Sequence, residues 1–532
     1  MEHLAILPIV LPLFAGAGLA LIDDRHHTIK LVINIGATLA LVAIAMLLLG
    51  DTAGGDARTM TYRLGNWPAP YGIVLVADQL STLMVMLTAA LALGVIVFSV
   101  ARWHRAGQHF NSLFQLLLMG LNGAFLTGDL FNLFVFFEVL LAASYGLALH
   151  GSGKSRVKAS LHYVAVNLAS SSLFLIGATA IYGVAGTLNM ADLALRIPLL
   201  SPGDQTLLQT GAAILGVAFL VKAGMWPLGM WLPTTYAAAA PPVAAMFAIL
   251  SKLGVYVILR LTALLFGESA GASAHFGDLV LQYGGLATIA FGTIGVLASQ
   301  GIARIACASV MVSSGTVLAM VAFEDAGVTA GALYYLVSST LGLACLFLLV
   351  ELMERGRSPG DDVLAVTLEA YGDDEEPDHA EEAGVATPAT FAALGVAFIC
   401  CALLVAGMPP LSGFLAKFAM IGAMLDLGGG AQGDVPANAW VTIAILIVSG
   451  LAATIALMRS GINTFWVSLE GVIPAVRAVE IAPILLFLAL GILMTVQAQP
   501  VMSFMDQAAS ALYARSEYVE AVLDVAATGP QR

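Results

Sequence analysis

Fourteen long runs of apolar residues occupy most of this 532-residue chain. A helix needs about 20 mostly apolar residues to cross a bilayer. The runs are continuous and do not alternate with polar residues, so they predict helices and not the strands of a membrane barrel. They lie at residues 4–22, 31–49, 80–100, 110–127, 130–149, 161–182, 207–232, 243–265, 279–298, 305–323, 328–350, 391–425, 440–458 and 481–496.

The composition supports this prediction. Charged residues make up 10% of the chain and hydrophobic residues 60%, whereas a soluble protein averages about 25% charged residues. So few charges exclude a soluble enzyme, a disordered protein and a nucleic-acid-binding protein. The sequence therefore predicts an all-α polytopic membrane protein with about 14 transmembrane helices.

Two of the runs contain helix-breaking prolines. Pro227 interrupts the seventh run, while Pro409 and Pro410 interrupt the twelfth, which is too long for one straight span. Unwound backbone at bilayer depth is tolerated only inside protein or beside water, so each break marks a pathway. Because the two runs are five apart in order, they indicate two inverted five-helix repeats. The predicted units are 1–109 (three N-terminal helices), 110–265 (first repeat), 266–458 (second repeat) and 459–532 (last helix and tail).

Basic residues predict the orientation, since they gather on the cytoplasmic side. Twelve Lys and Arg residues flank the runs on one side, against six on the other, where Arg260 is counted with the loops. Both termini are therefore expected on the outer side. The loop at 358–388 carries ten acidic residues between Asp361 and Glu382 and no Lys or Arg, and it is expected in the cytoplasm.

Apart from Arg260, which is counted with the loops, four charged residues lie within the apolar runs: Glu138, Lys222, Lys252 and Lys417. A charge at the centre of a span costs about 2.5–3.5 kcal/mol, so each needs a reason to be there. Glu138 and one lysine can form a static pair that holds helices together, but two lysines then lack an acidic partner. The same residue types suit a substrate-binding transporter or a proton path, since buried lysines can gain and lose protons. His162, near the inner start of the sixth run, is either a proton entry or an interfacial residue.

Four motifs carry a resemblance to a known family. They are Asp129-Leu-Phe-Asn-Leu-Phe-Val-Phe-Phe-Glu138, Lys222 with the following Trp226-Pro227, Ser251-Lys252-Leu253-Gly254, and Pro409-Pro410-Leu-Ser-Gly-Phe with the following Lys417. In this order they resemble the antiporter-like subunits of Mrp antiporters and respiratory complex I. The chain looks most like the D subunit of the Mrp-type multisubunit Na⁺(K⁺)/H⁺ antiporters.

The resemblance implies a proton-translocating subunit of a monovalent cation/proton antiporter in the bacterial cytoplasmic membrane. Such a subunit is a secondary transporter and not an enzyme. Its partners would be the other Mrp subunits, the lipid bilayer, H⁺, and Na⁺ or K⁺ or Li⁺. By the family pattern, Glu138 pairs with Lys222, and protons pass through Lys252 to Lys417.

The chain shows no nucleotide-binding or cluster-ligand motif, so no cofactor or resident metal is expected. The alternative is a proton-pumping subunit of a complex I-type quinone oxidoreductase or of a membrane hydrogenase, because the buried charges suit both. The eleventh run departs from the family pattern. It reads Tyr335-Leu-Val-Ser338-Ser339-Thr340, where many relatives place a histidine. We expect the three hydroxyl side chains, with water, to bridge this gap.

Overall fold

The computed structural model describes residues 2–23, 25–54, 59–151, 153–355, 388–427, 434–465 and 476–523. The acidic residues expected in the cytoplasmic loop lie outside these ranges. In the described part, twelve helices are long and apolar enough to cross a membrane, and two shorter apolar helices, Phe110–Leu126 and Thr390–Ala406, match the fourth run and part of the twelfth. The prediction of about fourteen spanning helices is therefore confirmed.

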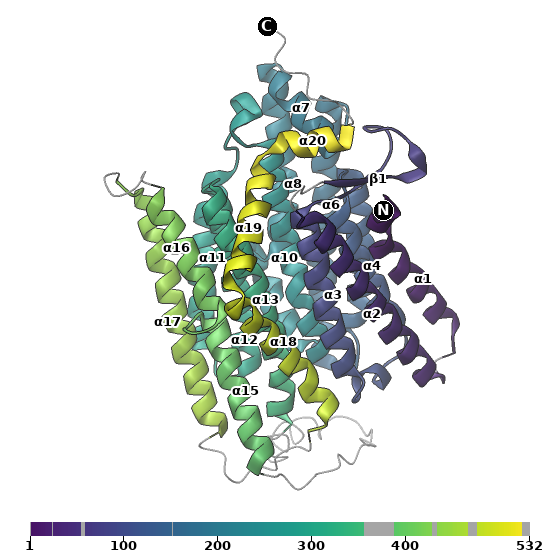
Figure 1. The fold of residues 1–532 in the computed structure, drawn as a ribbon, viewed down its shortest axis with the longest axis vertical. Coiled ribbons are helices and arrows are strands. Elements are labelled where there is room, and N and C mark those ends of the chain that lie inside the picture. The colour runs from purple at the N-terminus through teal and green to yellow at the C-terminus, as the bar shows by residue number, and fades with distance from the viewer. Residues whose placement is uncertain are drawn as a thin grey trace.

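The helices form one elongated bundle in which most run along its long axis (Figure 1). In chain order they are α1 (Leu7–Leu21), α2 (His27–Thr52), α3 (Gln79–Ser99), α4 (Phe110–Leu126), α5 (Leu130–Ala148), α6 (Lys154–Ala185), α7 (Met190–Arg196), α8 (Pro202–Ala223), α9 (Trp231–Ala238), α10 (Pro241–Leu265), α11 (Asp278–Ala298), α12 (Ile302–Val321), α13 (Ala326–Glu354), α15 (Pro388–Ala406), α16 (Ser412–Asp426), α17 (Ala437–Phe465), α18 (Ala478–Val496), α19 (Ala498–Tyr513) and α20 (Arg515–Leu523). Strands β1 (Met60–Arg63) and β2 (Val74–Ala77) pair antiparallel beside them, with Met60 opposite Ala77.

Both predicted helix breaks are present. The seventh span is split into α8 and α9 around Pro227, and the twelfth into α15 and α16 around Pro409 and Pro410. The same neighbours recur in the two halves of the chain. Helices α4 and α5 pack together as α11 and α12 do. Helix α6 packs on both halves of the broken seventh span, α8 and α9, as α13 packs on both halves of the broken twelfth span, α15 and α16. These pairs are the same distance apart in span order, as two five-helix repeats require.

Helices α10 and α13 lie at the centre of the bundle. The most apolar part of each is wholly buried, and they pack against each other. Helices on the outside, such as α2 and α17, leave large apolar side chains exposed, which suits a surface that faces lipid or partner subunits. Any polar group on α10 or α13 must therefore find its partners inside the protein.

The last span ends at Val496, as the sequence predicts, and a further helix follows it. Helix α18 leads directly into α19, which packs along α13. The buried residues of α19 are Met505, Ala508, Ala509 and Leu512, the spacing of one helical face. The apolar runs do not predict this helix because its outward face is polar and its average hydropathy is therefore low.

Arg260 corrects another expectation. The sequence places it with the outer loops, but it is buried near the end of α10 and forms an ion pair with Asp78, the N-cap of α3. Its guanidinium carbon lies 5.5 Å from the ring centre of Tyr256 and 5.4 Å from that of Tyr518 on α20. A buried arginine is tolerated when it is paired in this way. Asp78 is 182 residues away in sequence, so the hydropathy pattern does not reveal the pair.

Candidate functional site

Lys252 lies in the wholly buried part of α10, and its side chain is fully inside the protein. Its Nζ atom donates a hydrogen bond of 3.0 Å to Ser314 Oγ on the neighbouring helix α12. In the part of the chain that the structure describes, no carboxylate forms an ion pair with it. The hydroxyl of Ser314 is thus its polar contact on the neighbouring helix.

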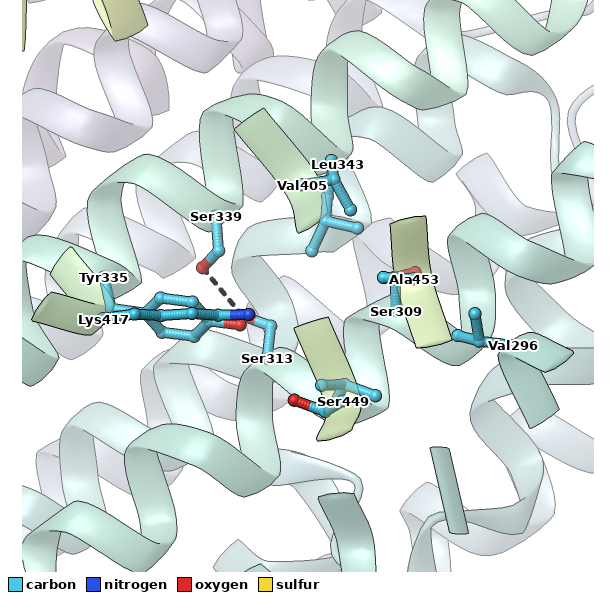
Figure 2. Close-up of a pocket in the computed structure, with 11 residues that line it drawn as sticks. Val296, Ser309, Ser313, Tyr335, Ser339, Leu343, Val405, Lys417, Ser449 and Ala453 are labelled. Atoms are coloured by element: carbon cyan, nitrogen blue, oxygen red, sulfur yellow. Dashed lines mark hydrogen bonds between the residues drawn. The ribbon is translucent and has the colours of Figure 1, made fainter. Parts of the chain in front are cut away.

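Serine hydroxyls continue this contact from helix to helix. Ser313, next to Ser314 on α12, has its Oγ 2.8 Å from Ser339 Oγ on α13, as the dashed line in Figure 2 shows. Ser338, the neighbour of Ser339, has its Oγ 2.8 Å from Ser412 Oγ, the first residue of α16. Adjacent residues on a helix point about 100° apart. Two serines adjacent in sequence can therefore contact different neighbouring helices, as Ser313 and Ser314 do on α12 and Ser338 and Ser339 on α13. Hydrogen-bonded side chains therefore connect α10 with α12, and α13 with both α12 and α16.

Lys417 lies on α16, five residues after Ser412, beside the second helix break. Its Nζ donates a 2.9 Å hydrogen bond to the carbonyl oxygen of Ala406, one of the last carbonyls of α15, which lack a partner within their own helix. Two glycines make room for the lysine. A Cβ on Gly407 would lie 2.9 Å from Lys417 Cδ, and one on Gly450 would lie 2.8 Å from Nζ. The break and the glycines together fix the position of this ammonium group.

A small cavity joins Lys417 to the serine pair. Lys417, Ser313, Ser339 and Tyr335 line it, and its volume is about 20 Å³ (Figure 2). A single water needs at least about 10–15 Å³ and two or more polar partners. The cavity therefore has room for one water between the hydroxyls and the ammonium group.

Lys222 lies at the other broken helix, one residue before α8 ends at Ala223. Its Nζ is buried 4.9 Å from the centre of the Phe137 ring. Neither this nitrogen nor Glu138 Oε1 has a hydrogen-bond partner among the described residues, although the Glu138 charge acts on Lys222. The two groups are thus neighbours without a direct ion pair. A buried ammonium and a buried carboxylate oxygen without partners are costly, so the space between Lys222 Nζ and Glu138 Oε1 is a place where a water would be favoured.

The other sequence candidates differ in position. Ser338 and Ser339 belong to the hydroxyl line, which we define as Ser313, Ser314, Ser338, Ser339 and Ser412. Thr340 instead donates a 2.6 Å hydrogen bond to the Leu336 carbonyl of its own helix. His162 lies on the exposed face of α6, beside Leu161, which is also exposed. The sequence does not single out Ser313 and Ser314. Their signal is a pair of hydroxyls inside the tenth apolar run, which is also common in helices that only pack.

Buried lysines, hydroxyls and two broken helices inside a bundle of spanning helices define an integral membrane protein with a polar line through its interior. Residues 127–431 match the family described as NADH:quinone oxidoreductase/Mrp antiporter, TM. The chain is 57% identical to the D subunit of a probable K(+)/H(+) antiporter of Rhizobium meliloti, over 100% of this chain and 99% of that protein. It is 34% identical to the D subunit of the Na(+)/H(+) antiporter of Bacillus subtilis, over 98% and 100%.

Solved structures agree with these relatives. A chain of the Mrp complex from Dietzia superposes with a TM-score of 0.82 at 25% identity, covering 98% of this chain and 100% of that one. A chain of the archaeal membrane-bound sulfane sulfur reductase gives 0.79 at 23% identity, covering 98% and 99%, and shares the fold alone. The chain belongs to the transmembrane family of the NADH:quinone oxidoreductases and Mrp antiporters, and the resemblance found in the sequence is confirmed.

Proposed function

We propose that this chain is the proton-translocating D subunit of a multisubunit antiporter that exchanges H⁺ for K⁺ or Na⁺. The relatives that match along their full length support the antiporter assignment, and the 57% identity to a probable K⁺/H⁺ antiporter subunit makes K⁺ the first cation to test. The observations that carry the proton part are the hydrogen bonds Lys252–Ser314 and Ser313–Ser339, which meet at adjacent residues of α12, and the cavity beside Lys417.

The line moves a proton by exchange of hydrogen bonds. A serine hydroxyl both donates and accepts, so it can take a proton on one side while it gives one up on the other. Lys252 delivers a proton to Ser314, a bridging water carries it from Ser314 to the adjacent Ser313, and Ser313 and Ser339 pass it to the cavity. Lys417 receives it there, beside the break that follows Ala406. Lys222 on α8 and Glu138 on α5 act at the first break.

Transport in vesicles tests this function. With an imposed H⁺ gradient, membrane vesicles that contain the whole complex should exchange H⁺ for K⁺, Na⁺ or Li⁺ without NADH or a quinone. Lys222→Ala or Glu138→Ala should abolish the exchange while the complex still assembles. Normal exchange in either variant would contradict the proposal. Exchange that requires electron donors would favour a redox-driven pump instead.

The orientation is part of the proposal. We infer that both termini lie on the outer side of the bacterial cytoplasmic membrane, because the basic residues gather at the opposite ends of the helices. A cysteine at Gly203, exposed at the start of α8, should react with an impermeant thiol reagent in intact cells. A cysteine at Ser155, exposed at the start of α6, should react only after the cells are opened. The reverse pattern would invert the topology.

A further inference from the structure

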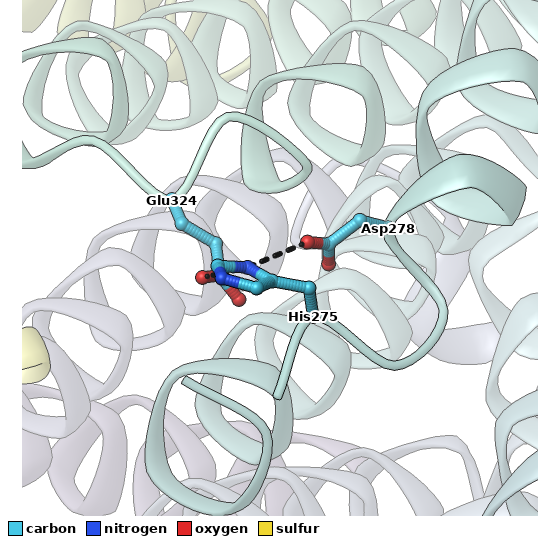
Figure 3. Close-up of side chains that lie close together, drawn as sticks. All are labelled: His275, Asp278 and Glu324. Atoms are coloured by element: carbon cyan, nitrogen blue, oxygen red, sulfur yellow. Dashed lines mark ion pairs between the residues drawn. The ribbon is translucent and has the colours of Figure 1, made fainter. Parts of the chain in front are cut away.

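Three chelating side chains meet where the connection from α10 to α11 approaches that from α12 to α13. His275 Nδ1 lies 2.8 Å from Glu324 Oε2 and 3.3 Å from Asp278 Oδ2 (Figure 3). One nitrogen and two carboxylate oxygens, one from each residue, all lie within 4.8 Å of one another. Ligand atoms bound at about 2.0–2.2 Å to one metal ion are separated from one another by distances similar to those in this cluster. The three atoms are therefore close enough to bind one ion after small side-chain movements.

The carboxylates have unused oxygens. The Glu324 side chain is only 9% exposed, and its Oε1 has no hydrogen-bond partner among the described residues. Asp278 Oδ1 is also buried without a partner in that part of the chain. Two carboxylates thus share one imidazole, and their remaining oxygens are removed from water. Buried carboxylate oxygens without partners are unfavourable, and a bound cation removes that cost.

The backbone holds the two sides of the cluster in place. His275 has a φ of 60° and Glu324 a φ of 47°, a left-handed conformation that residues other than glycine rarely adopt. The His275 amide donates a 2.7 Å hydrogen bond to the Phe266 carbonyl, and Asp278 is the first residue of α11. The side chain of His275 is 57% exposed, so an ion from the solvent can reach the cluster.

The mixture of ligands selects the class of ion. Ca²⁺ and Mg²⁺ prefer oxygen ligands throughout, whereas Zn²⁺ binds imidazole together with carboxylates. We propose that His275, Asp278 and Glu324 form a binding site for a divalent transition metal ion of the Zn²⁺ type. Three protein ligands leave a further coordination position for water.

The site lies at the ends of helices that carry the hydroxyl line. The short helix Glu268–Ser273, just before His275, packs against Ile197–Leu199, which follows α7, so the site lies on the α7 side of the bundle. The two connections join α10, which carries Lys252, to α11, and α12, which carries Ser313, to α13. A bound ion ties these helix ends together and restrains their relative movement. It follows, on the basis of the proposed function, that Zn²⁺ added on this side slows cation/proton exchange.

Metal binding is tested apart from transport. The purified whole complex is stripped with a chelator, separated from it, and titrated with Zn²⁺ against a fluorescent zinc indicator. His275→Asn and Glu324→Gln should each bind one equivalent of Zn²⁺ fewer than the unmodified complex at the same free concentration, and excess Mg²⁺ should not compete. His109→Asn is the matched control, since His109 is also exposed and also has a φ of 60°. Equal zinc binding by His275→Asn and His109→Asn would overturn the site.

Two further measurements keep the outcome clear. X-ray absorption at the zinc edge of the unmodified complex should show nitrogen and oxygen ligands from imidazole and carboxylates. Zinc bound by sulfur alone would contradict the assignment. Because this measurement uses the unmodified complex, it still decides the question if a variant fails to assemble. In vesicles, Zn²⁺ should slow exchange several-fold in the unmodified complex and much less in His275→Asn, which should exchange normally without zinc. Equal inhibition in both would overturn the effect on transport. A complex that binds zinc but shows no exchange at all would contradict the proposed function and leave the site standing.

Discussion

The substitution Lys252→Met separates a proton-carrying role for this lysine from a structural one. Lys252 is fully buried and makes one hydrogen bond, to Ser314, with no carboxylate paired to it in the described part of the chain. Methionine has a similar length and adapts to irregular spaces. The variant therefore keeps most of the packing on α10 and removes only the ammonium group.

The magnitudes favour a stable variant. A central ammonium costs about 2.5–3.5 kcal/mol in a span, and a hydrogen bond that involves a charged group returns about 1.5–3 kcal/mol. The lysine is thus a net cost of up to about 2 kcal/mol. Leaving Ser314 without its partner costs the variant about 1 kcal/mol. We expect a change in the free energy of unfolding between a loss of about 1.5 kcal/mol and a gain of about 1 kcal/mol. Breaking a static buried ion pair would instead cost about 3–5 kcal/mol.

Two assays decide between these roles. Cation/proton exchange is followed in everted vesicles with a dye that reports the pH gradient, and stability by heating the complex and measuring the soluble fraction. Lys252→Met should lose exchange. Its melting temperature should shift by no more than about 2–4 °C for each kcal/mol of stability change, and by less in a chain as large as this one. Lys154→Met, at the exposed start of α6, should change neither. Normal exchange in Lys252→Met, or a complex that falls apart, would refute the reasoning.

Three further substitutions probe the line and its surroundings. Gly450→Ala places a Cβ 2.8 Å from Lys417 Nζ and should reduce exchange several-fold, whereas Gly422→Ala, which has open space around it, should not; equal rates would contradict the role of the glycine. Ser339→Ala removes the 2.8 Å contact with Ser313 and should slow exchange about 100-fold, the lower end of the range for positioned proton-transfer groups; unchanged rates would exclude the hydroxyl line. Burial lowers the pKa of His150, just beyond the end of α5, so the neutral form stabilises the fold above the unfolded pKa of about 6.5. Stability should fall as the pH falls below that value, and heating at pH 7.5 and 5.5 should show a smaller drop for His150→Gln than for the unmodified complex.

Much of the fold follows from the sequence because a bilayer imposes one strong rule. A span must satisfy its backbone hydrogen bonds internally and present apolar side chains, so long apolar runs identify the helices. The breaks at Pro227 and Pro409 could be predicted for the same reason, since proline cannot donate the backbone hydrogen bond. The amphipathic α19 and the pair of Arg260 with Asp78 escape this rule. Their partners lie on elements far away in sequence, and only packing brings them together.

The candidate site was predictable in its charges and not in its connections. Lys222, Lys252 and Lys417 stand out because a charged residue in an apolar run is rare. Ser313 and Ser314 do not, since hydroxyl groups in spanning helices commonly bond to their own backbone. The structure shows the difference directly. Thr340 bonds to the Leu336 carbonyl of its own helix, whereas Ser339 also contacts Ser313 on the next helix.

The hydroxyls also explain how the eleventh span can do without an ionisable residue. Helix α13 is wholly buried in its most apolar part, so a further charge there, with no carboxylate beside it, would add about 2.5–3.5 kcal/mol to the cost of insertion. A serine carries no standing charge and still donates and accepts a hydrogen bond. In the proposed path, Ser339 passes a proton between Ser313 and the cavity beside Lys417 while α13 stays neutral. The ionisable groups are then Lys252, which has a hydroxyl partner, and the lysines at the two helix breaks.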